Sequence, residues 1–395
     1  MDRAVVQRKL GELTLGIPTW GLADSGTRFH VYKRPYSPRN LYERIDDAAQ
    51  VHKYVGDAPM VDLHLAWDKP DKEDWAGIRQ YAEDRGLKIG AVNPHLFNED
   101  KYTLGSLSNP DKRVREESIR KHVDAVEIAR QVGSTILSLW FADGTDYPGQ
   151  DNLRKRNRYM YEGLKATYDA LDPDMSMLVE YKFFEPNFYS MDLADWGTSF
   201  IMAQKLGERA RVLVDLGHHA LGTNIEQIVG VLLGEGKLGG FHFNDHRYAD
   251  DDLTVGSVNP YQLFLIFCEL VWAELDPTLD VSLDRIALMI DENHNFKNAI
   301  EGTIQSVEQL EIAYARALLV DYDFLHKAQD DGNVIDAEEC LKDAYLSDVR
   351  PLIREAREAK GLDPEPIKAF RRSGYISRVT EERRDRTAAT GSLGG

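Results

Sequence analysis

Short apolar runs recur along this chain, separated by longer stretches in which apolar residues return with a helical period. The runs are rich in Val, Ile, Leu or Phe, as buried parallel strands are. Eight runs have this character: Leu13–Pro18, Met60–Ala66, Lys88–Pro94, Ser134–Trp140, Ser176–Tyr181, Arg211–Leu216, Leu238–Phe243 and Arg285–Ile290. Amphipathic helices are expected between them, at Asp71–Arg85, Asp111–Val132, Ser190–Leu206 and Ile225–Leu233. The alternation predicts an α/β fold with a parallel sheet, and eight strands fit a closed (β/α)8 TIM barrel better than an open sheet.

Two segments depart from this rhythm. Gly21–Asn40 has mixed charge and no clear apolar period, so we expect a long loop that begins at the barrel mouth. Residues 306–360 are helical in pattern throughout. We therefore predict a catalytic barrel over residues 1–305. We expect a helical extension over residues 306–380 that packs on the barrel or on a neighbouring subunit. We expect residues 381–395 to form a disordered tail.

Composition narrows the class of protein. The 395 residues include 48 Lys and Arg against 66 Asp and Glu, which gives a formal net charge of −18. So negative a chain repels phosphate backbones. No apolar run approaches the roughly 20 residues that cross a bilayer, and Met1–Gly16 has no apolar signal-peptide core. Two cysteines, Cys268 and Cys340, exclude a disulfide framework. We expect a cytoplasmic enzyme with no nucleic-acid or membrane partner.

Acidic and imidazole side chains gather where the later strands are predicted to end. Seven candidate metal ligands lie at or just beyond these ends: Glu180, Asp215, His218, His242, Asp250, Asp252 and Asp291. The carboxyl ends of the strands form the active site of a (β/α)8 barrel, so these residues should converge. Oxygen-rich ligation with some imidazole suits Mn²⁺, Mg²⁺ or Co²⁺ better than zinc. So many ligands predict two divalent ions, with Asp215 as the candidate that both share.

A lysine accompanies the first of these carboxylates. Glu180 and Lys182 are two residues apart at the end of a strand, so both should face the barrel lumen. Burying an ammonium or a carboxylate costs several kcal/mol unless something compensates it. A metal ion beside Glu180 would do so, and the alternative is a solvent-exposed ion pair at a frayed strand end.

At these residues the sequence resembles the bacterial L-rhamnose isomerases of broad aldose specificity, within the xylose isomerase-like superfamily. The resemblance runs from about Leu13 to about Asn295. Its motifs are Pro-Thr-Trp-Gly at 18–21, Asp-Leu-His-Leu-Ala-Trp-Asp at 62–68, Trp140, Glu-Tyr-Lys at 180–182, Asp-Leu-Gly-His-His at 215–219, Phe-His-Phe-Asn-Asp at 241–245, the three aspartates at 250–252, and Met-Ile-Asp at 289–291. Each motif alone is common, but their ordered combination is specific.

The resemblance assigns roles to the residues. It implies that a structural metal is held by Glu180, Asp215, His242 and Asp291, and a catalytic metal by His218, Asp250 and Asp252, with Asp215 as the possible bridge. It implies catalytic roles for Lys182, His64, Asp291 and His218. Lys182 matches a lysine that contacts substrate oxygen near the reacting carbons, and His64 a histidine beside the ring oxygen or distal hydroxyls.

The same resemblance implies a sugar pocket. Trp20, Trp67 and Trp140 match its apolar walls, which with His64 and Lys182 would bind the substrate. Phe29 matches a residue on a mobile loop. In the family such a loop can cover the substrate of a neighbouring subunit, so we expect a homotetramer in which residues 21–40 contribute to an adjacent site.

The resemblance therefore predicts a metal-dependent aldose–ketose isomerase. The expected reaction converts L-rhamnose to L-rhamnulose, with activity on other aldoses such as D-allose. Two divalent ions per subunit, Mn²⁺ first and Co²⁺ or Mg²⁺ as alternatives, would bind O1 and O2 while hydrogen moves between C1 and C2.

Three rival functions share some of these features. A ketose 3-epimerase of the same superfamily would carry a Glu in place of Asp291 and a one-metal site. A metal-dependent DNA phosphodiesterase shares the barrel, but the charge of −18 argues against it. A sugar-binding module without activity would leave the number of acidic ligands unexplained.

Overall fold

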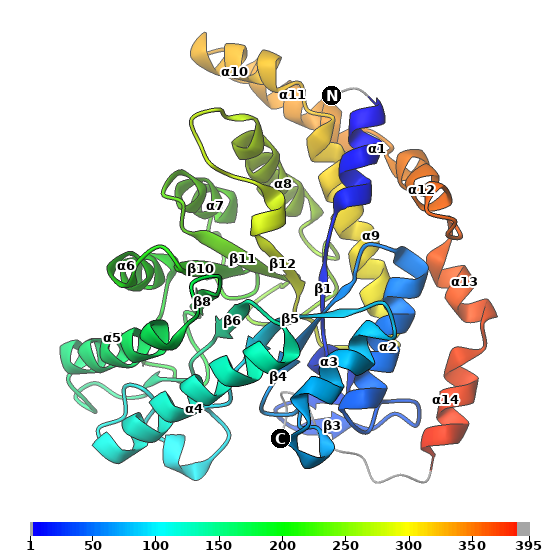
Figure 1. Ribbon diagram of the computed structural model, residues 1–395. Coiled ribbons are helices and arrows are strands. Elements are labelled where there is room, and N and C mark those ends of the chain that lie inside the picture. The colour runs from blue at the N-terminus through cyan, green and yellow to red at the C-terminus, as the bar shows by residue number, and fades with distance from the viewer. Residues whose placement is uncertain (1–2, 385–395) are drawn as a thin grey trace.

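Eight short strands close into a parallel barrel at the centre of the molecule (Figure 1). The computed structural model describes residues 3–384. In order around the barrel the strands are β1 (Gly16–Pro18), β4 (Met60–His64), β5 (Lys88–Asn93), β6 (Ile136–Leu139), β8 (Ser176–Glu180), β10 (Ala210–Asp215), β11 (Leu238–Phe243) and β12 (Ala287–Ile290). The barrel closes because β1 pairs with both β4 and β12. The predicted (β/α)8 fold is confirmed, and all eight apolar runs contribute a barrel strand.

One helix follows each strand and covers the outside of the barrel. These helices are α2 (Leu41–Val55), α3 (Trp75–Glu83), α4 (Lys112–Val132), α5 (Leu153–Ala170), α6 (Trp196–Leu206), α7 (Ile225–Gly234), α8 (Pro260–Leu275) and α9 (Ala299–Leu318). Each begins after an Asn or Asp whose side chain accepts a hydrogen bond from a backbone N–H of the first turn. Such a cap contributes about 1 kcal/mol and fixes where the loop from the preceding strand ends.

Further helices lie outside the barrel. These outer helices are α1 (Arg3–Glu12), α10 (Tyr322–Asp330), α11 (Val334–Leu346), α12 (Arg350–Ala359), α13 (Pro366–Arg372) and α14 (Tyr375–Arg383). Helices α12 to α14 run down one side of the molecule (Figure 1). Buried ion pairs attach α12 and α14 to helices of the barrel. Arg357 on α12 bonds to Glu311 on α9, and Arg383 on α14 bonds to Asp47 on α2 at 2.9 Å.

The boundaries of the predicted parts need adjustment. Helix α9 runs past residue 305, so the eighth barrel helix includes the start of the segment predicted as an extension over residues 306–380. Of the tail predicted to be disordered, residues 381–383 belong to α14, and residues 385–395 lie outside the described part of the chain.

Two local expectations were wrong. Within Gly21–Asn40, strands β2 (Ser25–Thr27) and β3 (His30–Tyr32) pair antiparallel, so the segment contains a hairpin. The helix expected from Ser190 begins only at Trp196, because Asp195 caps it and β9 (Ser190–Met191) pairs with β7 (Gly144–Thr145). Short 3-10 turns complete the fold: η1 (Trp20–Leu22), η2 (Asp71–Glu73), η3 (Asp100–Tyr102) and η4 (Leu283–Arg285).

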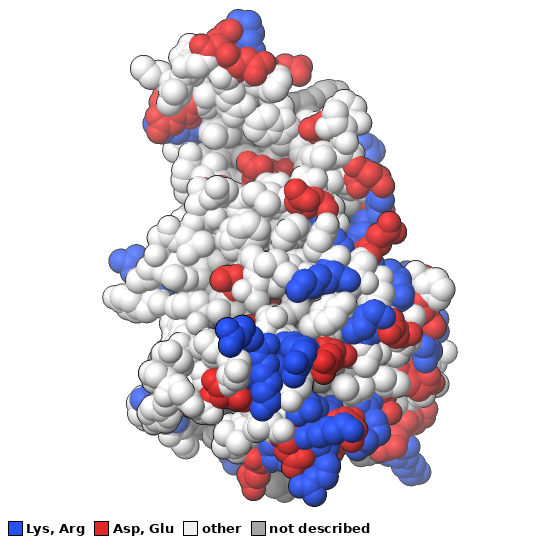
Figure 2. All heavy atoms as spheres, turned by 90° about the vertical axis from the view of Figure 1, so that its left-hand side faces the viewer, with Lys and Arg blue, Asp and Glu red and all other residues white. Residues whose placement is uncertain are grey.

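The helices and the surface charge indicate whether a membrane or a nucleic acid is a suitable partner. Within residues 3–384, no helix combines the length and the apolar character that crossing a membrane requires. Figure 2 shows a face on which Lys and Arg gather in the lower half, with Asp and Glu among them. On this face negative side chains interrupt the positive charge, whereas binding a phosphate backbone favours a continuous basic surface.

The barrel interior contains an apolar cluster in its middle and many polar side chains at its carboxyl end. A small cluster separate from the main core fills the middle, and its buried members are Ala91, Leu178, Leu213 and Met289. The main core lies between the strands and the surrounding helices. The inner cluster thus forms a floor on which a polar site can be built.

Candidate active site

A pocket at the carboxyl end of the barrel gathers most of the predicted site residues. It is lined by Trp20, His64, Trp67, Asn93, Phe97, Trp140, Glu180, Lys182, His218, His242, Asp250, Asp252 and Asp291. Asp215, which is buried, is not part of this lining, but its carboxylate adjoins those of Glu180 and Asp291. Phe29 is the predicted residue that the fold leaves apart: it lies on the hairpin and is 83% exposed.

Strand alternation explains why the polar side chains point inward. Glu180, Asp215 and Asp291 each follow a member of the inner apolar cluster by two residues, and such residues share one face of a strand. His242 is in register with Asp215 on one neighbouring strand and with Met289 on the other. The four side chains therefore all face the barrel interior near the carboxyl ends of their strands.

These side chains form two triads that share one aspartate. The ligand atoms of Glu180, Asp215 and His218 lie within 4.8 Å of one another, as do those of Asp215, His242 and Asp291. Glu180 Oε1 is 3.1 Å from His218 Nδ1 and 3.3 Å from His242 Nδ1. The resemblance assigned Glu180 and His218 to different metals, whereas here their ligand atoms adjoin. The triads form one continuous cluster.

The loop after β11 completes the cluster. Asp250 Oδ1 lies 3.3 Å from His218 Nε2, and Asp250 Oδ2 accepts a hydrogen bond from Lys182 Nζ at 2.6 Å. Asp252 has a φ of 47°, a left-handed conformation that is uncommon outside glycine. Asn293 holds it, because the Asn293 side-chain amide donates to Asp252 Oδ2 at 2.5 Å and its backbone N–H to the Asp252 carbonyl at 3.1 Å.

Crowded carboxyl groups dominate the electrostatics of the site. Burial, with nearby Glu180, raises the pKa of Asp215 to about 7, and burial also raises the pKa values of Asp252 and Asp291. Burial alone would raise the pKa of Glu180, but His242 and His218 lower it to about 2. Burial alone would lower the pKa of His242, but Glu180 raises it to about 10. Protons on histidine and aspartate therefore balance the negative charge of the cluster.

The donor set fits a divalent metal ion. Asp215 Oδ2 is buried and accepts no hydrogen bond, although a buried carboxylate oxygen normally has a partner. Several carboxylates with two imidazoles are ligands that oxygen-preferring divalent ions accept. Such an ion would replace the protons that balance the cluster. Glu180, Asp215, His218, His242 and Asp291 are therefore the residues that can hold a metal.

Aromatic rings form one wall of the pocket. The His64 ring centroid lies 4.3 Å from that of Trp67 and 5.6 Å from that of Trp20. Phe97 continues the wall, with its centroid 5.5 Å from His64 and 5.3 Å from Trp140. A wall of this kind excludes water and offers flat apolar surfaces to the C–H face of a sugar.

His64 presents a single hydrogen-bond donor. Its Nδ1 accepts from the Ala66 backbone N–H at 3.2 Å, which places the ring proton on Nε2, and burial lowers the His64 pKa to about 3. The backbone N–H of His64 donates to Asp68 Oδ2 at 2.7 Å, and Asp68 is buried in an ion pair with Arg44 at 2.8 Å. This pair fixes the end of β4, which carries His64, and the neutral imidazole keeps its donor.

Some site residues were missed in the sequence. Asn93 lines the pocket from the end of β5, and its place at a strand end was the available signal. Asn244 donates to Asp215 Oδ1 at 3.0 Å from the end of β11. Phe97 and Asn293 lie in loops, where neither spacing nor periodicity marks them.

The hairpin is attached at the pocket mouth although its tip is exposed. Ser25 Oγ donates to Asn295 Oδ1 at 2.9 Å, and the Asn295 amide donates to the Gly26 carbonyl at 3.1 Å. Asn295 belongs to the loop after β12, next to the residues that hold Asp252. Phe29 at the tip thus projects outward from an anchored base.

Known proteins are similar to this chain in sequence and in fold. The sequence profile of the family described as xylose isomerase-like TIM barrel matches residues 53–264. A protein of Rhizobium meliloti (strain 1021) named as a probable sugar isomerase is 39% identical over 406 residues, which cover 100% of this chain and 91% of that protein.

Solved structures agree in fold at lower sequence identity. A xylose isomerase domain protein from Alicyclobacillus acidocaldarius has a TM-score of 0.55 and 17% identity, covering 78% of this chain and 99% of that one. A D-psicose 3-epimerase structure determined in the presence of D-fructose has a TM-score of 0.50 and 14% identity, covering 78% and 97%. At these identities the likeness extends to the barrel and not to the reaction.

Proposed function

Since this chain belongs to the xylose isomerase-like TIM barrel family, we propose that it is a metal-dependent aldose–ketose isomerase. The observation that carries the proposal is the sharing of Asp215 by two ligand triads beneath an aromatic pocket. Lys182 and His64 enter the same pocket as hydrogen-bond donors. Metal ligands, polar donors and an apolar wall are the parts that sugar isomerisation requires.

Two divalent ions per subunit are part of the proposal, with Mn²⁺ first and Co²⁺ or Mg²⁺ as alternatives. Their ligands would be Glu180, Asp215, His218, His242, Asp250, Asp252 and Asp291. When bound, the ions would supply Lewis-acid polarisation of the substrate oxygens. Asn244 and Asn293 would hold the carboxylates of Asp215 and Asp252 for this purpose.

The side chains around the ligands bind and orient the sugar in this account. Burial lowers the pKa of Lys182, but Asp250 raises it above its ordinary value, so the ammonium stays charged and stabilises negative charge on a substrate oxygen. His64 donates from Nε2 to a hydroxyl or ring oxygen. Trp20 Nε1 donates to Asp291 Oδ1 at 2.8 Å and so links the aromatic wall to the ligand cluster.

A ketose 3-epimerase is the alternative reaction. In that reading a Glu at the last strand acts as base. The chain has a glutamate one residue after Asp291, but Glu292 accepts hydrogen bonds from the Ser306 hydroxyl and from the Val255 backbone N–H at 2.8 Å. Asp291 lines the pocket and Glu292 does not. This arrangement favours isomerisation.

The finer parts of the proposal concern substrate and assembly. We propose conversion of L-rhamnose to L-rhamnulose with activity on other aldoses such as D-allose, in a homotetramer. The anchored hairpin with its exposed Phe29 is suited to covering the pocket of a neighbouring subunit.

The test is incubation of the Mn²⁺-loaded protein with a panel of aldoses and, separately, of ketoses, followed by chromatography of the products. Isomerisation converts each accepted aldose to its ketose and back. Conversion of one ketose to another without any aldose would establish the epimerase instead.

A further inference from the structure

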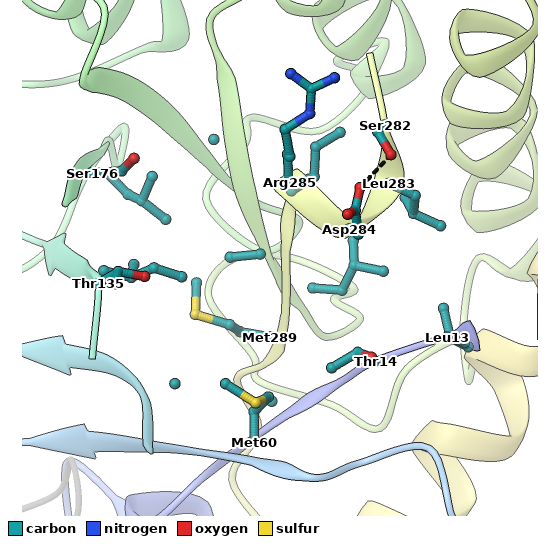
Figure 3. A pocket seen from close by; sticks show the side chains of 18 of the residues that line it. Leu13, Thr14, Met60, Thr135, Ser176, Ser282, Leu283, Asp284, Arg285 and Met289 are labelled. Carbon is teal, nitrogen blue, oxygen red and sulfur yellow. Dashed lines mark hydrogen bonds between the residues drawn. The ribbon is translucent and has the colours of Figure 1, made fainter. Parts of the chain in front are cut away.

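Asp62 is a buried carboxyl group that the proposed function leaves without a role. Met60, Asp62 and His64 lie on the inward face of β4. His64 lines the pocket at the carboxyl end, whereas Met60 and Asp62 line a second cavity of about 770 Å³ at the amino-terminal end. Figure 3 shows Thr14, Met60, Thr135, Ser176 and Met289 around this cavity. Asp62, 1% exposed, therefore lies between the cavity and the candidate active site.

Two glycines make room for this carboxyl group. A Cβ at Gly16 would lie 2.2 Å from Asp62 Oδ2, and a Cβ at Gly90 would lie 2.3 Å from Asp62 Oδ1. Any other residue at either position would displace the carboxyl group. Asp62 Oδ1 accepts a hydrogen bond from the Ala91 backbone N–H at 2.7 Å. Asp62 Oδ2 is buried without a hydrogen-bond partner, an arrangement that is costly unless something bridges to it.

His242 has a matching unpaired atom. Its Nδ1 faces the ligand cluster, 3.3 Å from Glu180 Oε1 and 3.5 Å from Asp291 Oδ2. Its Nε2, on the opposite edge of the ring, is buried without a hydrogen-bond partner. The outer nitrogen of a metal-ligating histidine almost always donates to a carboxylate, a carbonyl or a water. The ring therefore lacks the contact that would fix its tautomer and direction.

Strands β1 and β12 separate the two strands that carry the unpaired atoms, and Asp62 and His242 both face the barrel interior. Gly16, against which Asp62 Oδ2 rests, is in register with Met289 on β12, and Met289 is in register with His242 on β11. Met289 Cγ lies 3.2 Å from the Cβ position of Gly16. Burial raises the pKa of Asp62 to about 7, and the charge of His242 opposes this by lowering it.

We propose that Asp62 is a positioning residue for His242: a buried water joins Asp62 Oδ2 to His242 Nε2 and directs Nδ1 to the ligand cluster. Ser138 supplies a third partner, because its hydroxyl is buried without a hydrogen bond and it lies between Ile136 and Trp140 on the same inward face. A buried water typically makes about three hydrogen bonds. The amino-terminal cavity gives that water a route in.

This inference rests on the proposed function only in taking His242 as a metal ligand, so its test measures metal binding without substrate. Metal-free parent, Asp62→Leu and Asp62→Asn proteins are titrated with Co²⁺ against a competing chelator, with visible absorption as the readout. Loss of an outer partner of this kind costs about 10- to 100-fold in metal affinity. Asp62→Leu should show that loss, and Asp62→Asn, whose amide can still bond to a water, a smaller one.

Asp47→Asn is the matched control, because Asp47 is a buried carboxylate bonded to Arg383 outside the barrel. It should bind Co²⁺ like the parent. Circular dichroism and melting of each metal-free variant establish that it is folded. A folded Asp62→Leu protein with Co²⁺ affinity within about twofold of the parent overturns the inference. A parent that binds no Co²⁺ overturns the proposed function as well.

A second measurement needs no substitution. A high-resolution crystal structure of the metal-loaded parent should contain an ordered water within about 3.2 Å of both Asp62 Oδ2 and His242 Nε2. A dry gap, or another partner on His242 Nε2, overturns the inference even if Asp62→Leu fails to fold.

Discussion

Lys182 Nζ donates a hydrogen bond of 2.6 Å to Asp250 Oδ2, which joins the end of β8 to the loop after β11. Burial lowers the pKa of Lys182, but Asp250 raises it above its ordinary value. Burial raises the pKa of Asp250, but His218 and Lys182 lower it below its ordinary value. The ammonium is therefore charged and oriented before any substrate arrives. Preorganised charge of this kind costs no rearrangement during the reaction.

Replacing Lys182 should separate turnover from metal binding. In Lys182→Met we expect kcat to fall by about 100- to 1,000-fold, as when one preorganised donor to a developing charge is lost. Metal content, measured by elemental analysis, should not change. Lys165→Met, which removes a lysine from the exposed face of α5, is the control and should keep parent kcat. Near-parent kcat/KM in Lys182→Met would remove the lysine from the mechanism.

The two ends of the ligand cluster should respond differently to substitution. Asp252→Asn should lose most turnover while keeping the fold and one bound metal, because Asp252 lies in a loop held by Asn293. Glu180→Gln should lose both metal content and thermal stability, because Glu180 ends a barrel strand and borders both histidines. Metal analysis and melting curves distinguish them. Asp252→Asn with two metals and near-normal kcat would contradict this division.

Metal binding should release protons. Burial and Glu180 raise the pKa of Asp215 to about 7, and Glu180 raises the pKa of His242 to about 10 despite its burial. A divalent ion needs the carboxylate and the neutral imidazole, so binding expels these protons. The apparent affinity should therefore rise with pH up to about pH 10, and more steeply below about pH 7. Calorimetric Mn²⁺ titrations in buffers of different ionisation enthalpy count the protons. An affinity independent of pH would show that the metal binds elsewhere.

Phe29 offers a test of assembly. It is 83% exposed on a hairpin anchored at the pocket mouth. If it covers the pocket of an adjacent subunit, Phe29→Ala should raise KM or broaden the aldose preference by roughly 10- to 200-fold, the range for losing one apolar contact. Metal content and the mass of the assembly in solution should not change. Equal kcat/KM values for several aldoses in Phe29→Ala and the parent would make the hairpin a passive connection.

The barrel could be predicted from the sequence because each strand is marked by the apolar residues of its own segment. A parallel strand that is covered on both faces is an apolar run, and each of the eight runs overlaps a barrel strand. Strand alternation also placed His242, between Phe241 and Phe243, on the inward face, where the pocket is. The ligand cluster follows from these two facts together with the rule that barrel sites form at carboxyl ends.

What the sequence hid depends on contacts between distant segments. Strands β2 and β3 have three residues each and little burial, so no alternation marks them. The start of α6 is set by the Asp195 cap and by the pairing of β9 with β7. Phe97 lines the pocket only because its loop passes there. The Glu292 side chain points away from the pocket and accepts a hydrogen bond from Ser306. None of these outcomes has a periodic signal.

We propose that Asp215 and its neighbours hold the ions on which sugar isomerisation by this protein depends. The most direct measurement is NMR of an accepted aldose labelled with ¹³C at C1, incubated with chelator-treated protein before and after addition of Mn²⁺. We predict that the anomeric signal persists in the metal-free sample and converts to the ketose C1 signal once Mn²⁺ is present. Full conversion by protein shown to be metal-free by elemental analysis would contradict the account.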